Sequence, residues 1–287
     1  MTEVIDLRHG ALSVQIAPAV GGSIARFCMA QRDVLRCAPT SAADCASAVL
    51  MGSFPMVPFA NRIRNGCFDW QATTIHIPAN INGSALPIHG VGWLQRWRPI
   101  GQCTSTRAQI RLIHEPDQAW PFAFAADQTF TLDAAGLEVQ LDLRNSGDHP
   151  MPATLGYHPY FPAKPRLQTI TSGIWESDQN CLPVRHLEAA FINQQLASGV
   201  GLEQFDVDHT LTGWNGVATL DWPGLRVDLK ASTPLSCLHL FTPPSEPFVC
   251  VEPVSSPADG LNSPHQPMSL AANQSVSIKM RIEPRLT

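Results

Sequence analysis

Residues 136–145 read GLEVQLDLRN, and this stretch is the clearest indication of the fold class. Leucine or valine occupies positions 137, 139, 141 and 143. Polar residues occupy positions 138, 140, 142 and 144. A period of two places the apolar side chains on one face of an extended strand and the polar ones on the other. The stretch therefore predicts a β-strand with one buried face and one face in water.

The same alternation occurs in other parts of the chain. Upstream, FTLDAAG ends in a turn, so residues 128–144 are predicted to form a hairpin, and residues 218–232 form a second around Pro223 and Gly224. Residues 13–36 indicate short strands joined by turns, and residues 275–284 alternate like the first stretch. Repeated hairpins of this kind favour an antiparallel sheet structure.

Helices are expected to be few and short. The chain contains 25 prolines and 19 glycines, which are spread along its length and interrupt helical hydrogen bonding. One candidate helix remains, HLEAAFINQQLASG at residues 186–199. Since no linker, repeat or low-complexity tract divides the chain, we predict one all-β domain over residues 1–287, a large antiparallel β-sandwich.

The composition excludes several classes of partner. Hydrophobic residues make up 44% of the 287 residues, enough for a large core, and the net charge is −5. With no long Lys/Arg run, we expect neither nucleic-acid binding nor attraction to an anionic membrane surface. The N-terminal residues lack a cationic segment before an apolar run, and no stretch has the length of a transmembrane helix. We therefore expect a cytoplasmic protein.

The cysteines show no metal-binding or redox motif. The eight are Cys28, Cys37, Cys45, Cys67, Cys103, Cys181, Cys237 and Cys250. No two of them form a C-x-x-C pair, and without an export signal we expect free thiols packed as small hydrophobic groups. The spacing predicts no metal site.

Two titratable residues stand in apolar stretches where an ordinary core strand would not place them. His158 lies in GYHPYF (156–161), and an imidazole can donate or accept a proton near neutral pH. Glu252 follows the apolar run of FVCVEP (248–253), and loss of solvent there would raise its pKa toward the range of a general base. The alternatives are a structural histidine and a strand-end glutamate that reaches into water. G-x-S-x-G, H-E-x-x-H and P-loop signatures are absent.

A candidate ligand for a bound molecule follows a proline-rich segment. In FPMVPFANRIRNGCF (54–68), the guanidinium of Arg62 could donate several hydrogen bonds to ligand oxygens. The alternative is an ion-pairing surface arginine, a role that suits Arg64 better.

Two further candidates lie in turn-like sequences. His89, in LPIHGVGW (86–93), precedes a glycine that allows close approach of the backbone. Asp208, in FDVDHTLTGW (205–214), stands next to His209. The alternatives are a turn histidine and an Asx turn, respectively.

In combination these motifs are similar to those of a known family. They occur along the chain in the order PMVPFANRIRNG (55–66), PIHGVGW (87–93), GYHPYF (156–161), DVDHTLTGWNG (206–216) and CVEP (250–253). This order resembles the aldose 1-epimerase (galactose mutarotase-like) family from about residue 50 to residue 262, and ANRI and HPYF are its most specific parts. The resemblance implies a β-supersandwich whose cleft binds a pyranose sugar and interconverts its anomers.

The resemblance also implies roles for individual residues. Glu252 is expected to act as the general base and His158 as the general acid, while Arg62, His89 and Asp208 are expected to bind sugar hydroxyls. The reaction needs neither a metal nor an organic cofactor. The expected partner is a small-molecule sugar, and the protein is expected to be a monomer or a homodimer.

The sugar and the activity both have alternatives. The run GYHPYFP lacks the asparagine and the N-L pair that the galactose-specific members carry, so the sugar stays open. One alternative is a mutarotase of an anionic sugar, a hexose phosphate or sulfonate, bound with the help of Arg96, Arg98, Lys164 and Arg166. Against it, Trp93 stands where the sugar-phosphate branch often has arginine. The other alternative is a sugar-binding or sensing β-sandwich without catalysis.

Overall fold

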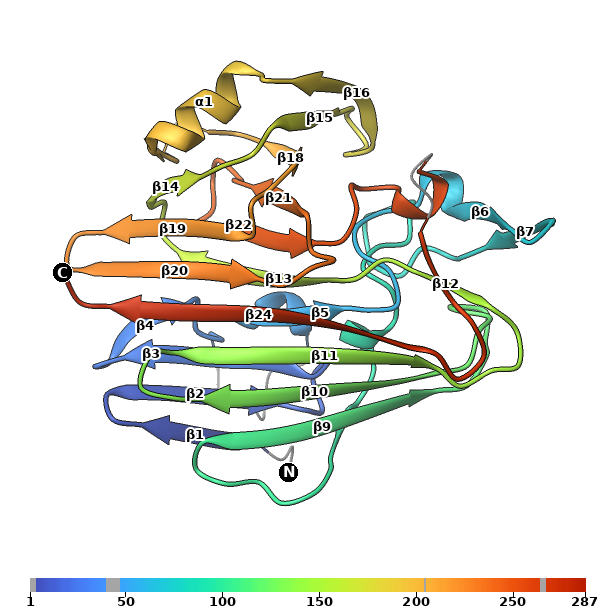
Figure 1. The fold of residues 1–287 in the computed structure, drawn as a ribbon, viewed down its shortest axis with the longest axis horizontal. Coiled ribbons are helices and arrows are strands. Elements are labelled where there is room, and N and C mark those ends of the chain that lie inside the picture. Colours follow the sequence, from blue (N-terminus) through green and yellow to red (C-terminus); the bar gives the residue numbers. More distant parts are fainter. Residues whose placement is uncertain (1–3, 40–46, 204, 264–266) are drawn as a thin grey trace.

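Two large antiparallel sheets form most of the protein (Figure 1). The computed structural model describes residues 4–39, 47–203, 205–263 and 267–287. In Figure 1 the sheet that contains β9, β10, β11 and β24 lies in front of the sheet that contains β1, β2, β3 and β13.

Within the described residues the first sheet has 11 strands. In sheet order they are β1 (Ile5–His9), β2 (Leu12–Ala17), β3 (Ser23–Met29), β5 (Ser53–Met56), β13 (Gly156–Pro162), β22 (Phe248–Val254), β21 (Cys237–Phe241), β18 (Asp208–Thr212), β15 (Gly173–Ser177) and β16 (Pro183–Glu188), and β4 (Arg32–Leu35) pairs with β3.

The second sheet has nine strands in the same described ranges. In sheet order they are β17 (Val200–Gly201), β14 (Arg166–Thr169), β19 (Val217–Trp222), β20 (Leu225–Ala231), β24 (Ser275–Arg285), β11 (Leu137–Asn145), β10 (Phe124–Leu132), β9 (Arg107–His114) and β8 (Arg98–Pro99). Two small pairs are β12 (Met151–Ala153) with β23 (Met268–Leu270), and β6 (Cys67–Trp70) with β7 (Thr73–His76). The helical elements are α1 (Phe191–Ser198) and the short 3₁₀ turns Ala48–Leu50, Arg64–Gly66, Gly92–Leu94 and Gly260–Asn262.

The core lies between the inner faces of the two sheets. The apolar residues of β11 are fully buried there, and they pack in one cluster with Tyr157 and Phe161 from β13 of the first sheet. The Tyr157 hydroxyl donates a hydrogen bond of 3.0 Å to the Val139 carbonyl oxygen, which ties the sheets together through a group that would otherwise be buried unpaired. This arrangement confirms the predicted all-β antiparallel sandwich.

The predicted hairpins are present. Strands β10 and β11 pair from Leu132↔Leu137 outward, and β19 and β20 pair around Pro223 and Gly224. Residues 13–36 form β2, β3 and β4, and residues 275–284 lie within β24. Alternation therefore located these strands correctly, because each of them has one face in the core.

The predicted helix at residues 186–199 was partly wrong. Helix α1 begins at Phe191, whereas His186, Leu187 and Glu188 extend β16 and pair with β15. Cross-strand pairing at the sheet edge therefore overrides the local helical pattern at these three residues. Among the described residues, no helix is sufficiently long and apolar to cross a membrane.

Candidate active site

The central strands of the first sheet are buried on both faces. In β22, Val249 and Val251 face the core between the sheets, while Cys250 packs in a second apolar cluster on the opposite face. Glu252 follows the same alternation and belongs to this opposite face, where it is 1% exposed. A charged side chain is thus directed onto an apolar sheet surface and not into water.

The strand register forms a row of polar side chains on this face. His239 in β21 is paired with Glu252, and Thr210 in β18 is paired with His239. His158 lies midway between the paired positions Gly156↔Val254 and Tyr160↔Cys250, which places it beside Glu252 on the other flank. Glu252 therefore lies between two histidines, each on a neighbouring strand.

Glu252 and His158 are in direct contact. His158 Nε2 lies 3.3 Å from Glu252 Oε1, and their side chains are 8% and 2% exposed. Within the described part of the chain, the other ring nitrogen, His158 Nδ1, and the other carboxyl oxygen, Glu252 Oε2, are buried without a hydrogen-bond partner. Buried polar atoms normally have partners, so these two atoms mark a place where a polar ligand would bind.

Burial favours the uncharged form of both groups. It raises the pKa of Glu252 to about 8, against the opposing charge of His239. It lowers the pKa of His158 to about 3. Between these values the pair holds one proton, and in the free site that proton resides on Glu252.

Aromatic rings fix the orientation of His158. Its ring stacks on Phe54, with centroids 4.6 Å apart, and on Tyr160, with centroids 4.5 Å apart. Trp93 stacks in turn on Phe54, and the Arg36 guanidinium carbon lies 3.8 Å from the Tyr160 ring centroid. The imidazole is therefore held in one position, beside aromatic surfaces that suit the apolar face of a sugar ring.

An ionic network lies on the opposite flank of Glu252. Asp208 Oδ1 accepts a hydrogen bond of 2.8 Å from His239 Nε2, and Asp208 Oδ2 lies 3.5 Å from Arg62 Nη1. Burial alone would raise the pKa of Asp208, but the hydrogen bond from His239 and the charge of Arg62 lower it overall. Burial lowers the pKa of His239, but the carboxylates of Glu252 and Asp208 raise it overall.

His89 enters the site from a tight turn. Its φ is +59°, and its Nδ1 accepts a hydrogen bond of 3.2 Å from the backbone N–H of Asn61. The next residue, Gly90, has a φ of +71°, and a Cβ at this position would lie 2.2 Å from the Val57 carbonyl oxygen. Glycine is required there, and the close backbone approach expected from the sequence is present. Burial lowers the pKa of His89 well below its ordinary value, which leaves Nε2 as a neutral N–H donor.

All five candidate site residues line a single cavity of about 150 Å³. The lining residues are Val49, Phe54, Asn61, Arg62, Ile81, Ile88, His89, Trp93, His158, Tyr160, Asp208, His239, Phe241 and Glu252. The fold thus brings together residues that are up to 190 positions apart in the sequence, from Arg62 to Glu252.

Sequence reasoning missed His239 and Asn61. His239 lies in CLHLF (237–241) as a single polar residue within an apolar strand, the same signal that identified Glu252. Asn61 has a φ of +60° and contacts the His239 ring at 3.3 Å through its side-chain amide. Asn61 belongs to the ANRI motif (60–63), in which the sequence assigned a role only to Arg62.

The other candidate cations lie elsewhere. Among the described residues, Arg96, Arg98, Lys164 and Arg166 are not part of the cavity lining. Arg64 was expected to form a surface ion pair, and its Nε lies 3.1 Å from Asp259 Oδ2.

A larger hollow of about 660 Å³ lies next to Trp175, His186 and the hydroxyl groups of several serines. Its lining in the described residues contains no carboxylate. The smaller cavity is therefore the candidate active site, since it alone of the two combines an acid with a base.

Three side chains in the cavity region are close enough to hold a metal ion. The ligand atoms of His158, Cys250 and Glu252 lie within 4.8 Å of one another. Cys250 is fully buried in the apolar cluster, where its thiol packs as a small hydrophobic group. The donor set fits an acid–base pair better than a metal centre.

Comparison with known proteins places the chain in one family. The family model for aldose 1-epimerase matches residues 3–283. The uncharacterised Escherichia coli K12 protein YphB is 29% identical over 295 residues, which cover 97% of this chain and 98% of YphB. A crystal structure from the same organism, described as a candidate aldose 1-epimerase, has a TM-score of 0.90 at 27% identity and 99% coverage of both chains. The galactose 1-epimerase of Lactobacillus acidophilus shares the fold, with a TM-score of 0.80 at 17% identity, covering 99% of this chain and 94% of that one.

The raised pKa of Glu252 predicts a pH-dependent cost to stability. Because the pKa rises from 4.5 to about 8 on folding, the folded state keeps this proton while the unfolded state releases it over that range. The free energy of unfolding of the wild type should therefore fall, relative to Glu252→Gln, by ~1.4 kcal/mol per unit of pKa shift as pH rises through this window. Denaturant unfolding of both proteins at several pH values measures the difference.

The control is Glu246→Gln, since Glu246 is exposed in the loop before β22 and lies outside the cavity lining. Denaturant unfolding of this variant under the same conditions reports the effect of removing a surface carboxylate. A constant difference for Glu252→Gln would show that Glu252 titrates as an ordinary glutamate.

Proposed function

Because the chain belongs to the aldose 1-epimerase family, we propose that it interconverts the α and β anomers of a pyranose sugar by acid–base-catalysed ring opening and reclosure. The observation that carries this proposal is the 3.3 Å contact between His158 Nε2 and Glu252 Oε1 in the wall of the cavity. A mutarotase needs one group to remove a proton from the anomeric hydroxyl and another to protonate the ring oxygen. These two side chains supply both groups.

The size of the cavity supports a single sugar ring. Its volume of about 150 Å³ lies below the roughly 300–1,000 Å³ of pockets for drug-sized ligands. The lining combines aromatic rings with hydrogen-bonding groups, which match the two kinds of surface that a pyranose presents. Since the four additional cations lie outside the lining, the cavity favours a neutral sugar over a phosphorylated one.

The proposed reaction begins with the cyclic sugar. Glu252 removes the proton from the C1 hydroxyl as His158 donates a proton to the ring oxygen O5. The C1–O5 bond breaks, with its electron pair going to O5, and C1 becomes the carbonyl carbon of an open-chain aldehyde. Rotation about the C1–C2 bond presents the other carbonyl face to the O5 hydroxyl. Reclosure returns each proton to the group that supplied it and yields the other anomer.

The protonation states of the free site correspond to the middle of this cycle. After ring opening Glu252 carries the proton and His158 is neutral, and burial favours this combination in the free protein as well. The site is therefore electrostatically matched to the open-chain aldehyde. Reaction of the cyclic form requires an ionised Glu252 and a protonated His158. Hydrogen bonds of these two groups with O1 and O5 of the sugar would stabilise their charges.

The ionic network has a positioning role in the proposal. Arg62, His89 and Asp208 present donors and an acceptor to the sugar hydroxyls from around the cavity. His239 holds Asp208 through the 2.8 Å hydrogen bond, and its positive charge when protonated limits the rise in the pKa of Glu252. Without this opposing charge, Glu252 would remain protonated to still higher pH and would be a poorer base.

Removing either member of the pair should abolish most of the activity. Positioned proton transfer contributes ~10²–10⁴-fold to a rate, so Glu252→Gln and His158→Ala should each lower kcat by about that factor. Exchange NMR on equilibrated sugars, neutral and anionic, reports anomer interconversion directly. The matched control is Glu246→Gln, which should keep the wild-type rate.

Two outcomes would contradict the proposal. Near-full activity of Glu252→Gln would remove Glu252 from the reaction. A wild-type protein that binds sugars and accelerates no exchange would instead be a sugar-binding protein.

The pair should also determine the pH profile. The reactive state holds one proton, and this state exists between the pKa of His158, about 3, and that of Glu252, about 8. We expect kcat/KM, corrected for the uncatalysed rate, to be bell-shaped and to fall as pH rises through the upper value, because the pair then loses its proton. These limits belong to the coupled pair and not to single residues. A corrected kcat/KM that keeps rising well above this value would contradict the one-proton state.

The binding residues should affect affinity more than chemistry. Arg62→Ala removes a charged hydrogen-bond donor, a loss of ~1.5–3 kcal/mol. We therefore expect sugar binding about 10- to 100-fold weaker, with a smaller effect on kcat. The matched control is Arg64→Ala, two residues along the chain, which pairs with Asp259 outside the cavity and should leave sugar affinity unchanged. Equal sugar affinity in both variants would show that the sugar does not bind at Arg62.

A further inference from the structure

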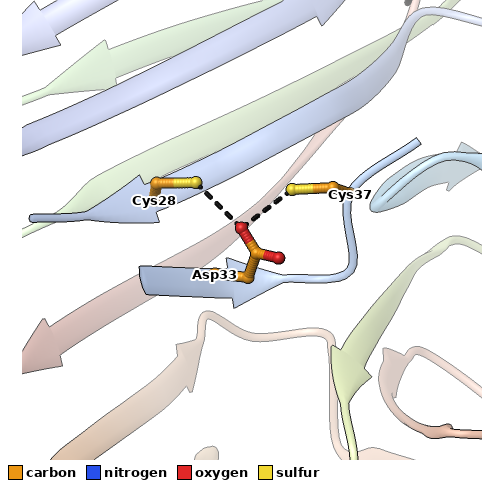
Figure 2. A group of neighbouring side chains, drawn as sticks. All are labelled: Cys28, Asp33 and Cys37. Carbon is orange, nitrogen blue, oxygen red and sulfur yellow. Dashed lines mark hydrogen bonds between the residues drawn. The ribbon is translucent and has the colours of Figure 1, made fainter. Parts of the chain in front are cut away.

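A second group of reactive side chains lies on the β3–β4 hairpin. Cys28 in β3 is the cross-strand partner of Asp33 in β4, and Cys37 follows two residues after β4 ends. Figure 2 shows the two cysteine side chains approaching the carboxylate of Asp33 from opposite sides. None of the three residues belongs to the lining of the sugar cavity in the described chain.

The ligand atoms of this group converge on one point. Cys28 Sγ lies 3.2 Å and Cys37 Sγ lies 2.9 Å from the same oxygen, Asp33 Oδ1. All three atoms are within 4.8 Å of one another. Zn²⁺ binds thiolate sulfur at ~2.3 Å and carboxylate oxygen at ~2.0–2.2 Å, so small side-chain rotations would bring all three onto one ion.

The charges around the group also suit a divalent ion. Arg26 Nε donates a hydrogen bond of 3.0 Å to Cys28 Sγ, and Arg26 Nη2 lies 3.8 Å from Asp33 Oδ1. Two thiolates and one carboxylate would carry three negative charges, and a divalent ion together with Arg26 would balance them. Hydrogen bonds to ligand atoms of this kind orient and stabilise a metal site.

The backbone holds Cys37 in place, and the group reaches the protein surface on the side of Arg26 and Asp33, while Cys28 itself is buried. The Ala38 N–H donates to the Ala25 carbonyl at 3.0 Å, and the Arg36 N–H donates to the Tyr160 carbonyl at 2.8 Å, so both neighbours of Cys37 are fixed to the sheet. The side chains of Arg26 and Asp33 are 49% and 41% exposed, which leaves a path for an ion.

We propose that Cys28, Asp33 and Cys37 form a binding site for a thiophilic divalent cation, Zn²⁺ foremost, with solvent as the fourth ligand. Softness of the donors selects such an ion over Mg²⁺ or Ca²⁺. The ion has a structural role: it fastens the hairpin to the segment that carries Arg36, whose guanidinium stacks on Tyr160 in the wall of the sugar cavity. The site is separate from the proton-transfer pair.

From the sequence we expected free thiols, in part because no two cysteines form a C-x-x-C pair. The hairpin instead brings together cysteines that are nine positions apart.

Cobalt substitution tests the site directly. The reduced full-length protein, stripped with a chelator, is titrated with Co²⁺ and then with Zn²⁺. We expect a thiolate-to-cobalt charge-transfer band that saturates at one ion per chain and is lost on addition of one equivalent of Zn²⁺. Zn²⁺ should also raise the melting temperature of the wild type, because an ion that binds only the folded state stabilises it.

Variants identify the ligands. Cys37→Ser should lose the band, and Asp33→Asn should weaken ion binding while keeping both thiols. The control is Cys103→Ser, which removes an exposed free cysteine outside the group and should keep the wild-type titration. In the wild type, Zn²⁺ should protect Cys37 from alkylation and leave Cys103 reactive, a readout that needs no variant.

Three results would overturn the proposal. They are the absence of a thiolate band at saturating Co²⁺, an unchanged band in folded Cys37→Ser, and equal alkylation of Cys37 with and without Zn²⁺.

Discussion

The buried contact between His158 and Glu252 is the constraint on which the rest of the site depends. Two titratable groups lie side by side on an apolar sheet face, where solvent cannot stabilise either charge. The pair therefore retains one proton over a wide pH range, and in the free protein the raised pKa of Glu252 and the lowered pKa of His158 keep this proton on Glu252 until it exchanges with a bound sugar. The surrounding aromatic stacks and the Asp208–His239 network hold the two groups in position for this exchange.

The β-sandwich provides this environment through a property of its strands. Strands such as β22 bury one face between the sheets and the other beneath the cavity, so that alternate residues serve stability and chemistry separately. Val249 and Val251 pack between the sheets and stabilise the fold. Glu252, on the opposite face, is buried at a cost in folding stability. The core between the sheets does not include Glu252, and its stability offsets the cost of burying the carboxyl group.

The strands could be predicted from the sequence because each has a core-facing side, and the alternation of residues 137–143 is the clearest case. The site residues emerged only through the order of their motifs, since His158 or Glu252 alone also has a structural explanation. His239 carried a readable signal, a polar residue in an apolar strand. The Cys28–Asp33–Cys37 group carried none, because only the hairpin register brings its members together. The helix boundary at Phe191 was set by sheet-edge pairing, which is not visible in local propensity.

The central claim is that Glu252 holds the proton of the pair in the free protein. Infrared difference spectroscopy between the wild type and Glu252→Gln isolates the carbonyl band of the protonated carboxyl group. The account predicts that this band is present at neutral pH and titrates near the raised pKa of about 8. A band that disappears near 4.5, the ordinary glutamate value, would contradict the account.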